Sequence, residues 1–125
     1  KETAGGYGSG YCYIDGLAFD KNGNLWMTSS EVNHAVLVLD KAGAWHRLDI
    51  EQLRGVYTIN DILITSTNDK WIYVPRNTPK LVMIPNSESL DEVSSYEFTT
   101  LIDTDGKELT PSNYTCVAED KDGYI

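Results

Sequence analysis

Three short segments carry carboxylates at alternate positions, a pattern that can bind a metal ion. They read Asp-Lys-Asn-Gly-Asn at 20–24, Asp-Thr-Asp-Gly at 103–106 and Asp-Lys-Asp-Gly at 120–123. An EF-type calcium loop has its glycine at the sixth place, whereas here glycine is fourth. Asp and Asn make Asx-turns, and Gly accepts a positive φ angle. We therefore interpret the segments as hairpin turns and predict no metal site.

The two histidines, His34 and His46, are the residues best suited to act as a base or a metal ligand. His34 falls in a loop at 31–34, and His46 falls on a strand predicted at 45–50. Neither belongs to a paired motif such as His-x-x-x-His. We interpret both as surface histidines, keep His34 as a candidate ligand-binding residue and predict no catalytic residue.

Aromatic residues divide into repeated and non-repeated ones. Trp26 and Trp71 occupy the same position of an internal repeat, which indicates packing between repeats. A scaffold does not require aromatics outside the repeat, so these are better ligand candidates; they are Tyr7, Tyr11, Tyr13, Trp45 and Tyr96. Trp45 and Tyr96 join His34 as candidate ligand-binding residues, although packing of an outer strand explains Trp45 equally well. The ligand itself is unknown from the sequence.

The repeat organises the whole chain. A shift of 45 residues aligns 14–41 with 59–86, and a shift of 100 residues aligns 17–25 with 117–125. The repeated structural residues are Asp20, Gly23, Trp26, Trp71, Asp120 and Gly123. We predict units at 12–55, 56–110 and 111–125, preceded by a linker or the tail of an earlier unit at 1–11. The second unit is ten residues longer than the first, and we expect the extra length within 87–110.

Each unit reads as short antiparallel strands. In the first unit we predict strands at 14–20, 25–30, 36–40 and 45–50, with a hairpin turn at Asn22-Gly23 in which both residues take positive φ. The apolar run at 36–39 is typical of a strand covered on both faces, and 45–50 alternates like a half-exposed outer strand. Four strands in about 45 residues are typical of a β-propeller blade. The predicted fold class is all-β, about two and a half propeller blades.

Composition limits the partners and the compartment. The 125 residues carry 10 Lys plus Arg against 19 Asp plus Glu, a net charge of -9, which argues against nucleic acid as a partner. No apolar run approaches the roughly 20 residues of a membrane span, so we expect no direct membrane insertion. Cys12 and Cys116 are too few for a disulfide scaffold, and whether they are bonded stays open.

The third unit stops in mid-hairpin, with a strand predicted at 116–119. We therefore expect the chain to be a fragment of a larger propeller whose remaining blades are its partners. The open sheet edges of an isolated fragment favour dimerisation.

Two segments, 16–28 and 116–125, resemble the repeat of the two-component-regulator propellers of Bacteroidetes, which reads apolar-x-x-Asp-x-x-Gly-x-apolar-Trp. The middle unit departs from this pattern. Thr65, Asn68 and Lys70 replace the Asp, the Gly and an apolar residue, so we expect its turn to differ. Within the family, 37–45 and 98–113 are most similar to a propeller protein of the type IX secretion system.

The resemblance implies an exported protein of the periplasm or cell surface. It implies a non-enzymatic binding or scaffold module without a cofactor, acting in type IX secretion and in attachment to cell-surface lipopolysaccharide. Its ligand would be a glycan, a glycolipid or a protein. The alternatives are the periplasmic glycan-sensing propeller of a hybrid two-component histidine kinase and a metal-dependent lactonase or lyase on a propeller.

Overall fold

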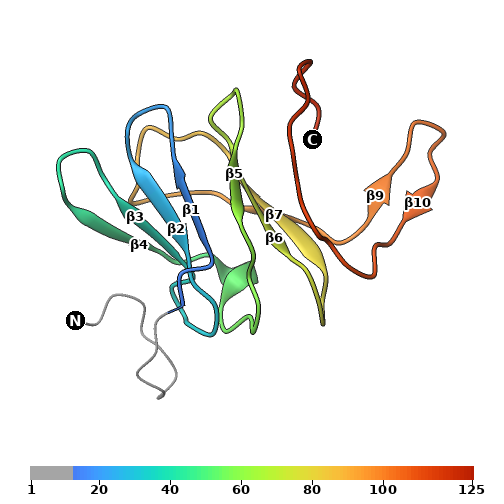
Figure 1. The fold of residues 1–125 in the computed structure, drawn as a ribbon, viewed down its shortest axis with the longest axis horizontal. Helices are drawn as coiled ribbons and strands as arrows, with labels where there is room; N and C mark the ends of the chain where they lie inside the picture. Colours follow the sequence, from blue (N-terminus) through green and yellow to red (C-terminus); the bar gives the residue numbers. More distant parts are fainter. Residues whose placement is uncertain (1–12) are drawn as a thin grey trace.

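The computed structural model describes residues 13–125 and consists of antiparallel β-sheets (Figure 1). The first sheet has the order β1 (Gly16–Phe19), β2 (Leu25–Thr28), β3 (Val36–Leu39), β4 (Trp45–Leu48). The second has the order β5 (Ile62–Ile64), β6 (Lys70–Val74), β7 (Lys80–Ile84), β8 (Tyr96–Phe98). A turn of 3-10 helix, η1 (Glu51–Leu53), connects them, and β9 (Leu101–Ile102) pairs with β10 (Glu108–Leu109).

The main core lies between the two four-stranded sheets. Both sheets are meanders, in which each strand pairs with the next one along the chain. Their facing side chains are nearly all apolar and buried; they include Trp26, Val36, Val38, Leu48, Ile62, Ile72, Val82 and Ile84. Burying one such side chain contributes about 1.5–3 kcal/mol, so this interface is a principal source of stability.

The two sheets stack head to tail. Side chains alternate along each strand, so Trp26 and its cross-strand partner Val38 face the second sheet. Trp71 occupies the same repeat position but faces away from the first sheet, toward Tyr114 and Val117. Each sheet thus presents its tryptophan face to the segment that follows it in the chain.

Five tight turns share one geometry, in which the first residue donates its N–H to the carbonyl of the fifth and accepts an N–H from the fourth. In the first turn, Asp20 N lies 2.9 Å from Asn24 O, and Gly23 N lies 3.1 Å from Asp20 O. The fourth residue takes a positive φ, which is 85° at Gly23. The prediction that Asn22 also does so is wrong, because this turn is a type I turn followed by one left-handed residue. The five turns begin at Asp20, Asp40, Thr65, Asp103 and Asp120.

The turn of the middle unit has the same geometry, so the expectation that it differs is wrong. The Thr65 hydroxyl accepts the amide of Asp69 at 3.0 Å, as an Asp carboxylate does in the other turns. Asn68 takes a φ of 70° in place of Gly. Both substitutions work because Thr makes the same type of turn and Asn tolerates the left-handed region.

The extra length of the second unit falls in two places. The connection between β3 and β4 spans 40–44, whereas the equivalent one between β7 and β8 spans 85–95; the β9–β10 hairpin holds the rest. The strand predicted at 116–119 is not formed. The following turn closes, with Asp120 N at 2.8 Å from Tyr124 O, but no described strand pairs with 116–119. Within residues 13–125 no helix is long and apolar enough to cross a membrane.

Candidate functional site

The carboxylates that suggested a metal site bind their own turns instead. Oδ1 of Asp20 accepts the amides of Asn22 and Asn24, each at 2.9 Å, and Oδ2 accepts the indole N–H of Trp26 at 2.9 Å. Burial opposes ionisation of Asp20, but these hydrogen bonds outweigh it and hold its pKa below the usual range. Oδ1 of Asp40, Asp103 and Asp120 likewise accepts two turn amides. In the part of the chain described, no group of three or more His, Cys, Asp or Glu could hold a metal ion.

A buried lysine lies where the two sheets meet. Lys70 is 1% exposed and occupies the repeat position of Leu25. Its Nζ donates to the carbonyl of Asn68 at 2.7 Å and lies 4.6 Å from the centroid of the Trp26 ring. Burial lowers the pKa of Lys70, while the nearby Asp20 and Asp69 carboxylates oppose the shift. The enclosed amine therefore joins the sheets by a cation–π contact and is shielded from solvent.

Side chains also join consecutive turns at one end of the stack, which we call the turn end (upper side in Figure 1). Oδ1 of Asn68 accepts the amide of Lys21 at 2.9 Å, and Lys21 Nζ also donates to the Ser66 carbonyl. The amide of Ser66 in turn donates to Glu119 at 2.6 Å. The turns of all three units are thus linked in a row.

The opposite end, the loop end, carries the longer connections. Oδ2 of Asp15 accepts the amide and the hydroxyl of Ser30 at 2.7 and 2.6 Å, and Ser30 Oγ accepts the amide of Ile59 at 2.8 Å. Nearby, the Ser29 hydroxyl and Nδ1 of His34 are buried without a hydrogen-bond partner in the described part of the chain. Both atoms are enclosed and lie beneath this end of the stack rather than on its surface.

The three predicted ligand candidates lie on separate surfaces. His34 lies in the loop between β2 and β3. Trp45 and Tyr96, both 53% exposed, lie on the outer strands of the first and the second sheet. By strand alternation Trp45 faces away from the second sheet and Tyr96 away from the first, so they flank the stack on opposite sides. The structure does not bring these residues together.

The other aromatics and the cysteines fall in different environments. Trp26 is buried in the main core, and Trp71 stacks on Phe98 with ring centroids 5.5 Å apart. Cys116 is exposed. Tyr7, Tyr11 and Cys12 lie outside the described residues, as does the proposed linker at 1–11.

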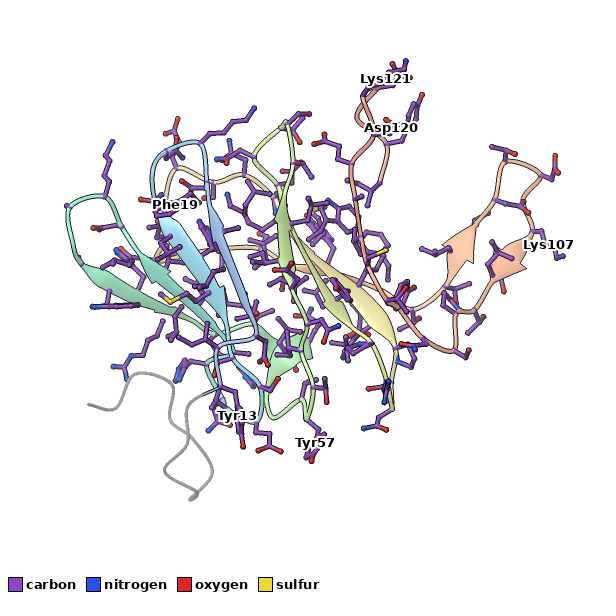
Figure 2. All side chains as sticks on the ribbon, viewed as in Figure 1. Tyr13, Phe19, Tyr57, Lys107, Asp120 and Lys121 are labelled. Atoms are coloured by element: carbon purple, nitrogen blue, oxygen red, sulfur yellow. The ribbon has the colours of Figure 1, made fainter. Side chains whose placement is uncertain are left out.

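Two tyrosines mark the loop end as the better candidate surface. Figure 2 shows Tyr13 and Tyr57 at this end of the stack, where they are 52% and 71% exposed. Exposed tyrosine rings offer an apolar face with a hydroxyl for hydrogen bonding, which suits a sugar ring or a partner loop. Tyr57 was not among the predicted ligand candidates. The sequence could have indicated it, because Tyr57 is a non-repeated aromatic in a connecting loop.

Two grooves lie beside the β7–β8 connection, residues 85–95, which we call the strap. The larger, about 490 Å³, is lined by Arg47, Leu48 and Asp49 of the first sheet and by strap residues 91–94. The smaller, about 360 Å³, lies at the turn end between the turns of the first sheet and strap residues that include Leu90. Most of the lining side chains are polar, so these grooves suit a polar segment better than an apolar ligand.

Two stacked four-stranded meanders with a 45-residue repeat define the class of fold as part of a β-propeller. Among solved structures, the chain is similar to PorZ, described as an essential bacterial surface component of the type IX secretion system of Porphyromonas gingivalis. The TM-score is 0.82 and the identity 18%, and the match covers 92% of this chain and 17% of PorZ. The chain therefore spans less than a fifth of the length of that protein. The likeness confirms the predicted all-β propeller fold.

No protein-family model and no curated protein matches the sequence, so membership of the two-component-regulator family is not shown.

Proposed function

We propose that the chain belongs to an exported, PorZ-like propeller that binds or scaffolds rather than catalyses, and that acts in type IX secretion and lipopolysaccharide attachment at the cell surface. The observation that carries the proposal is the fold match to PorZ over 92% of the chain. In its support, the repeated polar residues serve the turns and the contacts between sheets, which are scaffold roles.

The surface we assign to the ligand is the loop end. Its exposed Tyr13 and Tyr57 rings supply stacking faces. The net charge of -9 repels phosphate groups. We therefore assign the uncharged sugar portion of a glycolipid, rather than a phosphorylated headgroup, as the part recognised.

The test is direct binding of purified lipopolysaccharide, and of its delipidated polysaccharide, measured by titration calorimetry. Both should bind, and Tyr57→Ala should weaken binding about three- to tenfold, the effect of one lost aromatic stack. Tyr124→Ala is the matched control, because Tyr124 is similarly exposed but lies in the last turn at the turn end. Equal losses in the two variants would contradict the loop-end assignment, and absence of binding to either preparation would contradict the proposed function.

A further inference from the structure

The strap reaches from the second sheet back to the first. Figure 1 shows this connection between β7 and β8 extending across to the side of the β1–β4 sheet. Leu90 and Val93 pack against the main core, and near the end of the strap Ser95 donates to Gln52 at 2.9 Å. At its start, the amide of Asn86 donates to Asp69 at 2.8 Å. The strap is therefore anchored at both ends, and its middle lies against the first sheet.

One imidazole joins the middle of the strap to the first sheet. His46 Nε2 lies 2.9 Å from Oδ2 of Asp40, and Nδ1 lies 3.3 Å from Oδ1 of Asp91 in the strap. An ionised carboxylate only accepts hydrogen bonds, so both ring nitrogens must carry hydrogen to satisfy both partners. A neutral imidazole has one N–H and would turn a lone pair toward one carboxylate. The bridged arrangement therefore requires the imidazolium form.

The two carboxylates are held unequally. The Asp40 side chain is 21% exposed, and its Oδ1 is fixed by the amides of Ala42 and Ala44. The Asp91 side chain is 86% exposed. When the imidazolium loses one of its two ring protons, the neutral ring keeps its hydrogen bond to Asp40, whose carboxylate is held in place. The contact with Asp91 is then the one that is lost.

The turn repeat shows why this position can switch. Oδ2 of Asp20 accepts the ring N–H of Trp26, six residues on, and Oδ2 of Asp40 contacts the ring nitrogen of His46, also six residues on. The indole N–H does not titrate in the physiological range, whereas the imidazole does. The second turn of the first sheet thus holds a titratable ring where the first turn holds one that does not titrate, and its bond to Asp40 leaves Nδ1 directed at Asp91.

We propose that His46 is a proton-operated latch, which holds the strap on the first sheet when protonated and releases the middle of the strap when neutral. The two carboxylates that face the ring also line the grooves beside the strap: Asp91 lines the larger groove and Asp40 the smaller.

The groups around His46 favour its protonated form, in which the latch is closed. The pKa of His46 is raised: the hydrogen bond to Asp40 makes the largest contribution, burial opposes it, and the hydrogen bond to Asp91 adds to it. The other charged groups on the adjoining segments are Lys41, Arg47, Asp49, Glu88 and Glu92. Since the folded-state pKa is raised, the latch is fully closed below the unfolded-state pKa of histidine and opens as pH rises through the pKa of folded His46.

The first test follows the His46 imidazole by NMR during a pH titration. Asp91→Asn should lower the pKa of His46. Glu92→Gln is the matched control, because it removes the same charge from the neighbouring strap residue, which is not a hydrogen-bond partner of His46. An effect of Asp91→Asn on His46 no larger than that of Glu92→Gln would overturn the proposal.

The second test measures amide-exchange protection factors, which remove the intrinsic pH dependence of exchange, for strap residues 88–92. In the wild-type chain they should fall about two- to fivefold as pH rises through the pKa of His46, the range expected from a partly exposed ion pair. In Asp91→Asn they should not change with pH. Wild-type protection that stays constant across the titration would overturn the latch even if the pKa of His46 shifts.

Discussion

Lys70 breaks the repeat pattern and makes a contact between the two sheets. The apolar position that Leu25 occupies in the first unit holds an amine in the second, stacked on the Trp26 ring and bonded to one carbonyl. The sequence shows the departure, but local pattern cannot show burial, because the tryptophan that covers the amine belongs to the other sheet.

Replacement of Lys70 by Met tests the cost of this buried charge. We expect the free energy of unfolding to stay the same or to rise by up to about 2 kcal/mol, because a well-packed apolar side chain often replaces a buried charge without loss.

The folded-state pKa of Lys70 is lowered, so wild-type stability should rise with pH between the folded and unfolded pKa values. Urea unfolding at several alkaline pH values checks both points. The Met variant should lack this rise, and a rise of equal size in it would assign the effect to another group.

Gly16 is required for close approach rather than for a turn. A Cβ at this position would lie 2.8 Å from the Cα of Asp61, where β1 approaches the start of β5. Gly16→Ala should therefore lower the free energy of unfolding by about 1–3 kcal/mol, measured by chemical denaturation. Gly43→Asn is the comparison: that position has open space, so only the strain of its φ of 90°, which is smallest for Asn, opposes a side chain. A smaller loss for Gly16→Ala than for the control would contradict the close approach.

At the scale of elements, the tight turn is the part of the structure that the sequence predicted best. Asp at the first position and Gly at the fourth are local signals, and they located the turns even where the detailed φ pattern was wrong. Contacts between elements carry no such local signal. The strap contact of His46 and the failure of 116–119 to form a strand both depend on partners distant in sequence, so neither was predicted.

The turns differ in their contribution to stability. Asp20→Ala removes hydrogen bonds from two backbone amides, from the Asn24 side chain and from Trp26, and leaves the indole N–H buried without an acceptor. We expect a loss of about 2–4 kcal/mol in the free energy of unfolding. Asp103→Ala removes only the two amide contacts of an exposed turn and should cost less. Similar losses from the two substitutions, in thermal or urea unfolding, would show that the side-chain bonds from Trp26 and Asn24 contribute little.

At the scale of the whole molecule, one face of the first sheet exposes apolar side chains along its edge strand β1, although Met27 and Leu37 on the same face are buried. Leu17 and Phe19 are 56% and 70% exposed, whereas Ile62, which takes the position of Leu17 in the second sheet, is buried by the first sheet. The repeat predicted the stacking of the sheets, because equivalent positions are apolar in both units. It could not place the proposed ligand surface, because the position of Tyr13 and Tyr57 at one end depends on how the two units stack.

The open face should drive self-association of the isolated chain. We expect dimers or larger species in sedimentation velocity at micromolar concentration, because large exposed apolar patches on β-sheets associate. Phe19→Lys should shift the distribution toward monomer, and Tyr124→Lys, an equally exposed site in the last turn, should not. A chain that sediments as a monomer at every concentration would contradict this prediction.

The contact between Lys70 and Trp26 also limits which blade can precede the second unit in an engineered propeller. A second copy of the first unit could follow the original, because it would present Leu25 to Trp26. A second copy of the second unit would instead present Lys70 to Trp71, whose turn begins with Thr65 and lacks the carboxylate of Asp20. Lys70 therefore limits what can precede the second unit: the preceding blade must supply a tryptophan and a carboxylate placed like Trp26 and Asp20.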